Sequence, residues 1–227
     1  MNITSPAGQE YLVGDLVGQT SSYRLRLCTQ LGTGRECLLQ VAIDPVHNGI
    51  LDREAFILRE LAAKAAEFEE DYIPKRRFEN ERLNYHFGFP EVVESFILTQ
   101  QGGRRINILS FPCLEAVDAP LNVRDLVPLH NIVFKDHRRV DLKTSPWILG
   151  KSLKLLAFAH DNGIEVGHLD LTKILIQPDE HFVIFLDWAQ ARVHPDGVSP
   201  AIQRQEIIDV TRAVITLMGG DPATRAF

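Results

Sequence analysis

Three polar side chains in the last third of the chain are placed where they can do chemistry. His168 and Asp170 lie two residues apart, and Asp187 follows an apolar run that ends at Leu186. An imidazole can act as a general base, and a carboxylate at the end of a strand can bind a cation. Structural roles compete with both. A buried histidine is the favoured interpretation of His168, and an Asx-type turn accounts for Asp187 as well as a bound cation does.

A second polar group lies in the first 60 residues. Gly18, Ser21 and Ser22 fall between two apolar runs. A flexible glycine lets backbone amides approach a ligand, and the hydroxyls can donate hydrogen bonds. One glycine in such a turn is also typical of an ordinary hairpin, which we favour. Asp44 follows the next strand-like run, and Glu54 lies early in a segment of helical periodicity.

The elements that position these residues can be read from hydrophobic periodicity. In the first half, short apolar runs separated by turns predict five antiparallel strands. Apolar residues at helical spacing predict one helix after the third strand, with Asp52 as its cap. The glycine pair at residues 102–103 is typical of a hairpin between the last two strands. The predicted strands are 11–18, 23–30, 36–43, 91–98 and 104–111, and the helix is 51–68.

The second half is predicted to be mostly helical. A short helix over 122–129 is followed by a longer one over 145–161, which ends before Asn162-Gly163. Two short apolar runs, 173–177 and 182–186, form a hairpin through the turn at 178–180, and a last helix covers 200–218. The charged stretch 67–83 is either an extension of the first helix or an exposed loop.

This order of elements resembles that of the protein kinases, over nearly the whole chain. The resemblance implies an α+β, protein-kinase-like two-lobed fold. It comprises an N-lobe over 1–112, with a five-stranded antiparallel sheet and one helix, and a truncated, mainly helical C-lobe over 113–227. The segments that carry it are Gln40-Val41-Ala42-Ile43-Asp44, Arg53–Leu58, Leu155–Gly163, Ile174–Ile176 and Phe182–Asp187.

Phosphoryl transfer in that family needs a lysine that grips the phosphates and a glutamate that holds this lysine. In the third-strand motif, Asp44 falls at the lysine position. A negative charge there should repel a triphosphate. Glu54, at the position of the glutamate, then has nothing in this motif to pair with. The resemblance therefore predicts a degenerate nucleotide cleft formed by Gly18, Ser21, Ser22, Asp44 and Glu54.

The catalytic loop can be aligned in two ways. If His168-Leu169-Asp170 matches the family's His-x-Asp, Asp170 orients the acceptor hydroxyl, but the loop is two residues short and no asparagine follows. Aligned without a gap, His168 takes the position of the catalytic aspartate and Lys173 that of the asparagine. We favour the ungapped alignment slightly. Asp187-Trp188 resembles the magnesium motif of small-molecule phosphotransferases such as aminoglycoside kinases.

The favoured function is therefore a pseudokinase, a kinase-like domain that acts as a binding, scaffold or regulatory module and has no cofactor. The alternative is a divergent phosphotransferase that uses Mg-ATP through Asp170 and Asp187. A third interpretation is an unrelated α+β binding protein. We expect a protein partner or a further domain, with contact surfaces at 67–82 and on the last helix, and a homo-oligomer stays open.

Composition narrows the class of partner. The net charge of −6 argues against nucleic acid and anionic membranes as partners, since both select basic surfaces. No segment has the length and apolarity of a membrane span. The three cysteines form no CxxC pair, so neither a zinc site nor a disulfide framework is expected. A cytoplasmic location is the prediction.

Overall fold

The computed structural model describes residues 1–78, 83–114, 119–179 and 181–224. Contacts divide the chain into two compact units. The first unit comprises Met1–Glu60 and Pro90–Val123, and the second comprises Leu61–Phe89 and Arg124–Phe227. The domain boundary at residue 112 stays a prediction. Residues 79–82 of the charged stretch and residue 180 of the hairpin turn lie outside the described part of the chain.

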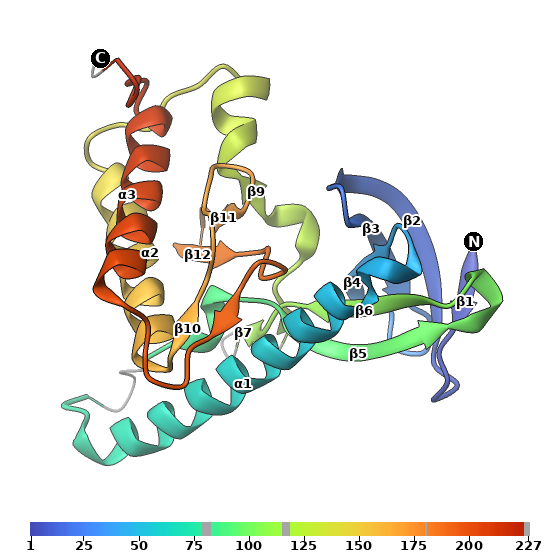
Figure 1. The fold of residues 1–227 in the computed structure, drawn as a ribbon. Coiled ribbons are helices and arrows are strands. Elements are labelled where there is room, and N and C mark those ends of the chain that lie inside the picture. Colours follow the sequence, from blue (N-terminus) through green and yellow to red (C-terminus); the bar gives the residue numbers. More distant parts are fainter. Residues whose placement is uncertain (79–82, 115–118, 180, 225–227) are drawn as a thin grey trace. The chain divides into compact units, whose positions relative to one another are not determined.

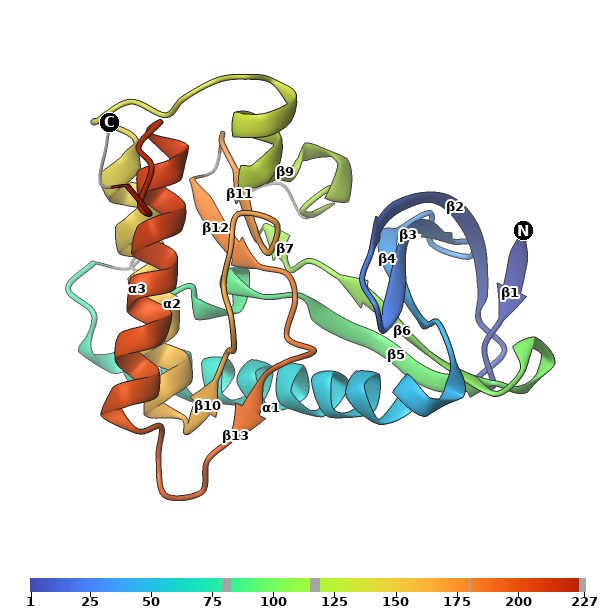
Figure 2. The ribbon, with the colours of Figure 1, turned by 45° about the horizontal axis from the view of Figure 1, so that its top comes forward.

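The first unit is built on a six-stranded antiparallel sheet with the order β1-β2-β3-β4-β6-β5 (Figure 1). Figure 2 shows how strongly its strands curve. All five predicted strands are confirmed, and β1 is an addition that was not predicted. The strands are β1 (Asn2–Thr4), β2 (Glu10–Gln19), β3 (Tyr23–Gln30), β4 (Glu36–Ala42), β5 (Glu91–Leu98) and β6 (Arg104–Ser110).

Helix α1 (Asn48–Tyr72) is longer than predicted, and its first half belongs to the first unit. Leu51 and Leu58 on this half are fully buried. The side chain of Asn48 accepts a hydrogen bond from the Arg105 amide at 2.7 Å and donates one to the Gly103 carbonyl at 2.8 Å. The expected cap at Asp52 was wrong, because the helix begins four residues earlier. The unit also contains the short pair β7 (Cys113–Leu114) and β8 (Ala119–Pro120).

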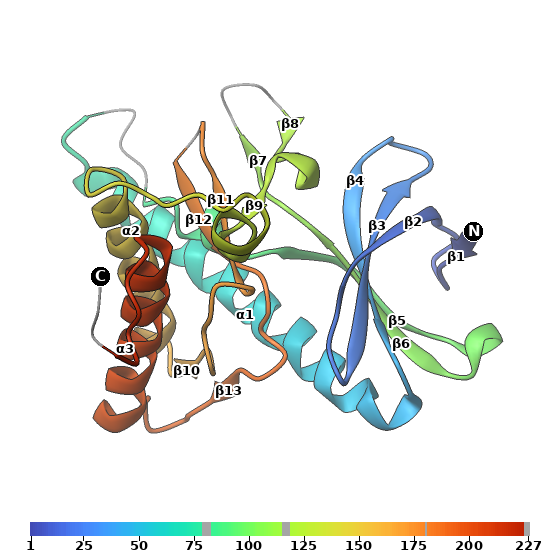
Figure 3. The same cartoon turned by 90° about the horizontal axis from the view of Figure 1, so that it is seen from above.

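The second unit contains two long helices that pack side by side, α2 (Ser145–Asp161) and α3 (Pro200–Leu217) (Figure 3). Both match the prediction, and Ser199 caps α3 by accepting a hydrogen bond from the Ile202 amide. Next to them lies a three-stranded sheet in the order β12-β11-β9. Its strands are β9 (Val127–Pro128), β11 (Ile174–Gln177) and β12 (Phe182–Phe185), and a separate pair is β10 (Ile164–Glu165) with β13 (Arg192–Val193).

One predicted helix of the second half was wrong. Residues 122–129 form a 3-10 turn at Val123–Asp125 followed by β9, which pairs with Leu175 and Ile176 of β11. A π-helical turn, Asn131–Lys135, comes next. Within the described residues, no helix has both the length and the apolarity needed to cross a membrane.

Candidate functional site

The first unit contains a buried polar network centred on Glu54, whose side chain is fully buried on α1. Gln40 on β4 donates a hydrogen bond from Nε2 to Glu54 Oε2 at 2.7 Å. Asn107 on β6 donates from Nδ2 to Gln40 Oε1 at 3.1 Å and to the Leu51 carbonyl at 2.9 Å. Because a buried polar group is costly unless it is hydrogen-bonded, this network fixes α1 against the sheet within the unit.

The expectation that Glu54 lacks a partner in the third-strand motif was therefore wrong. Its partner in that motif is Gln40, four residues before Asp44. Asp44 lies beyond the end of β4, and its exposed carboxylate accepts a hydrogen bond from the Val46 amide at 3.0 Å. Asp44 thus starts a short 3-10 turn. The structure brings Gln40 and Glu54 together and leaves Asp44 outside their network.

Ser21 and Ser22 lie in the turn that closes the β2–β3 hairpin, whereas Gly18 belongs to β2 and pairs with Leu25 of β3. Thr20 organises the turn, since its hydroxyl accepts hydrogen bonds from the amides of Ser22 and Tyr23, each at 3.1 Å. Gly18 does not have a left-handed backbone, and an added Cβ would meet Leu25 at an ordinary contact distance of 3.7 Å. Its conformation therefore does not require glycine.

In the second unit, two carboxyl groups one helical turn apart on α3 hold the loop that follows β10. Glu206, only 3% exposed, accepts from the Gly167 amide at 2.5 Å and lies 2.5 Å from Nε2 of His160. Gly167 has a φ of +96°, and an added Cβ would lie 3.0 Å from Gln190 Cβ, so glycine is required there. Sequence analysis missed Glu206. Its place on the same face of the helix as Asp209 was the available signal.

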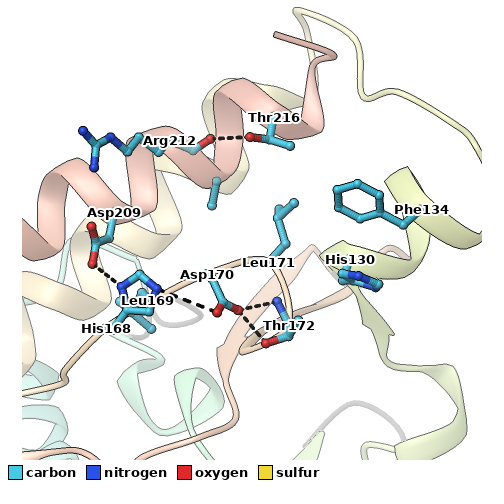
Figure 4. A pocket seen from close by; sticks show the side chains of 11 residues that line it. His130, Phe134, His168, Leu169, Asp170, Leu171, Thr172, Asp209, Arg212 and Thr216 are labelled. Carbon is cyan, nitrogen blue, oxygen red and sulfur yellow. Dashed lines mark hydrogen bonds and ion pairs between the residues drawn. The ribbon is translucent and has the colours of Figure 1, made fainter. Parts of the chain in front are cut away.

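Asp209 orients His168, with 2.8 Å between its Oδ2 and the ring Nδ1. The predicted burial of His168 was wrong, because 64% of its side chain is exposed. Figure 4 shows the ring between Asp209 and Asp170, whose Oδ2 lies 3.9 Å from Nε2. A carboxylate that fixes one imidazole nitrogen and leaves the other accessible is an arrangement that can serve a general base.

The carboxylate of Asp170 is hydrogen-bonded mainly to residues of its own loop. Its Oδ1 accepts hydrogen bonds from the Thr172 amide at 2.7 Å and from the Thr172 hydroxyl at 2.5 Å. These residues form one wall of a cavity of about 310 Å³. Phe134 and His130, whose rings are 4.7 Å apart, lie on its opposite side in Figure 4. The volume is at the lower end for small-molecule sites.

Asp187 lies two residues after the end of β12 and close to Lys173, the residue before β11. Lys173 Nζ is 3.4 Å from Asp187 Oδ2, and the two side chains are 14% and 11% exposed. The other oxygen, Oδ1, accepts a hydrogen bond from the Ala189 amide at 3.1 Å. This last contact is the Asx-type turn named as one interpretation of Asp187. The neighbouring Trp188 is fully buried and donates to the Phe185 carbonyl at 2.7 Å.

No family model matches this sequence, and no curated protein matches it either. Solved structures do match. One is described as "Structure of vaccinia related kinase 3", with a TM-score of 0.64 and 14% sequence identity over 99% of this chain and 69% of that chain. The chain has a protein-kinase-like fold. At this identity the similarity establishes the fold alone, so function has to be argued from the site.

Proposed function

We propose that this chain is a pseudokinase, a kinase-like binding module that does not transfer phosphate. The observation that carries the proposal is the Gln40–Glu54 hydrogen bond in the first unit. In the kinase resemblance, the buried glutamate of the helix holds the lysine that grips the nucleotide phosphates. Here the group that Glu54 holds on the third strand of the motif is an amide, which carries no charge.

The loss of one positive charge is large on the scale of nucleotide affinity. A unit charge about 4 Å from a phosphate oxygen is worth about 4 kcal/mol at an effective dielectric near 20. Such a difference corresponds to roughly a thousandfold in a dissociation constant. The guanidinium groups of Arg24 and Arg26 on β3 are directed to other partners, since they donate to Gln19 Oε1 and to the Gly14 carbonyl on β2.

The test is thermal denaturation of the protein with ATP and magnesium, together with an assay for ATP turnover. A ligand at 100 times its dissociation constant stabilises a protein by about 2.7 kcal/mol. We expect neither a shift in Tm nor turnover. A magnesium-dependent shift accompanied by turnover, both lost in Asp187→Ala, would instead establish the divergent phosphotransferase that uses Asp170 and Asp187.

A binding module needs a partner, and we propose that it is a protein or a further domain rather than nucleic acid or a membrane. The second unit supports this with apolar side chains on its surface. Ile207 and Ile208 on α3 are 43% and 36% exposed, and Phe134 beside the cavity is 54% exposed. Exposed apolar groups of this size favour a protein contact or a second copy of the chain.

A further inference from the structure

The geometry points to Lys173 as a built-in cation that occupies the position of a metal ion at Asp187. The kinase-like fold implies a divalent metal at this aspartate. The side chains around Asp187 have a different chemistry, because the nearest side-chain partner given by the structure is an ammonium group. An ammonium has three donors and no lone pair, so it cannot be a metal ligand.

All three donors of Lys173 have an acceptor nearby. Nζ lies 2.8 Å from the His168 carbonyl, 3.4 Å from Gln190 Oε1 and 3.4 Å from Asp187 Oδ2. The ammonium therefore links the loop at 168 with the turn that follows β12. This is the structural task that a bound cation performs when it joins oxygen atoms from two segments.

Both oxygens of Asp187 are also engaged, Oδ2 by Lys173 and Oδ1 by the Ala189 amide. Magnesium requires several oxygen ligands at about 2.0–2.1 Å in nearly octahedral geometry. A divalent ion at Oδ2 would lie within a few ångströms of the ammonium, and the two positive charges would repel each other.

Asp170, the other carboxylate of the predicted site, does not complete a metal site. Asp170 directs Oδ1 to the amide and hydroxyl of Thr172. Among the residues that the structure describes, no group of three or more His, Cys, Asp and Glu side chains is arranged to hold a metal ion. The donor set around Asp187 thus does not fit a divalent metal, and Lys173 supplies the positive charge instead.

The inference predicts that removal of the ammonium uncovers a metal site. Lys173→Asn replaces three donors with an amide that has one acceptor oxygen, next to an Asp187 that has lost its cation. Terbium(III) is a suitable probe, because it prefers oxygen ligands and its emission is sensitised by a nearby indole. Trp188 is adjacent to Asp187, and Trp147 is the only other tryptophan, so the experiment uses a Trp147→Phe background.

In this background we expect no saturable terbium emission from the otherwise unchanged protein or from Lys143→Asn, a matched control at an exposed lysine of the same unit. Lys173→Asn should bind terbium at least about tenfold more tightly than the Trp147→Phe background does. The additional change Asp187→Asn should abolish the emission, and magnesium should compete for the site. Lys173→Gln serves as the second variant, and circular dichroism establishes that each variant folds.

Two results would overturn the inference. One is saturable emission from the unchanged background that Asp187→Asn removes, since the ammonium would then not exclude the metal. The other is the absence of emission from folded Lys173→Asn and Lys173→Gln. Neither result decides the proposed function, which rests on Gln40 in the other unit and is tested by ATP binding and turnover.

Discussion

The buried network of the first unit and the charged cluster of the second each provide a hydrogen-bond donor for a carboxyl group. The donor is neutral in the first unit and positively charged in the second. Glu54 is held by the neutral amide of Gln40, whereas Asp187 is held by the ammonium of Lys173. Burial explains the difference. Glu54 is fully buried, where pairing with the neutral Gln40 amide avoids the cost of removing a second charge from water, while the Lys173–Asp187 pair keeps partial access to solvent.

The comparison also shows how this chain departs from the kinase pattern. That pattern has a lysine beside the glutamate of the first unit and an asparagine near the aspartate of the second. Here Gln40 is the amide in the first unit, and Lys173, in the ungapped alignment, is the cation in the second. In that alignment, an amide contacts the glutamate of the first unit and an ammonium contacts the aspartate of the second, the reverse of the kinase pattern. If the two environments differ in this way, substitutions in the buried network of the first unit should have larger effects than substitutions in the charged cluster of the second.

The largest expected effect is at Gln40. Gln40→Leu removes both the donor to Glu54 and the acceptor of Asn107, and all three side chains are buried. The free energy of unfolding, measured by urea denaturation, should fall by about 3 kcal/mol. Gln19→Leu, at an exposed glutamine of β2, should change it by less than about 0.5 kcal/mol. Equal effects from the two variants would show that the network contributes little to stability.

The position of Gln40 shows that the residue opposite Glu54 could not be predicted from the strand pattern. The motif placed Asp44 at the lysine position, four residues along. In a strand, residues four apart point to the same face, so alternation of apolar and polar residues could not distinguish the two registers. The missed signal was the polar side chain of Gln40 inside the apolar run 37–42, because a buried amide needs a partner.

The long elements and the β11–β12 hairpin could be predicted, but the strands of two or three residues could not. Strands β2 to β6 of the first sheet, α2 and α3 each contain enough residues to show a hydrophobic period, whereas the three-residue β1 does not. Strands such as β10 and β13 contain two residues each and exist through pairing with each other across about 28 positions of sequence. The short helix at 122–129 failed for the same reason, because β9 is defined by its contact with β11. The expected burial of His168 failed because Asp209 and Glu206 hold its loop at the surface.

A smaller effect is expected at Lys173 and Asp187. A double-mutant cycle with Lys173→Met and Asp187→Asn should give a coupling of about 1 kcal/mol in the free energy of unfolding. The pair Lys64–Glu67 on α1 is the control. It is closer, at 2.7 Å, but its side chains are 43% and 62% exposed, so its coupling should be only about 0.3 kcal/mol. If the shorter, exposed pair proved stronger, burial would not be what distinguishes the two.

The smallest effect concerns the cost of placing a charged group in the interior of the first unit. Burial raises the pKa of Tyr11 above its ordinary value, and the negative charge of Glu94 raises it further. An unfolded tyrosine loses its proton near pH 10 while the folded one keeps it, so this stabilising contribution is complete below pH 10 and is lost as pH rises. Between pH 9 and 10.5, Tyr11→Phe should lose about 0.8 kcal/mol less of its free energy of unfolding than the unchanged protein does. Identical pH dependence of the two proteins would mean that a phenolate is tolerated in the interior of the first unit.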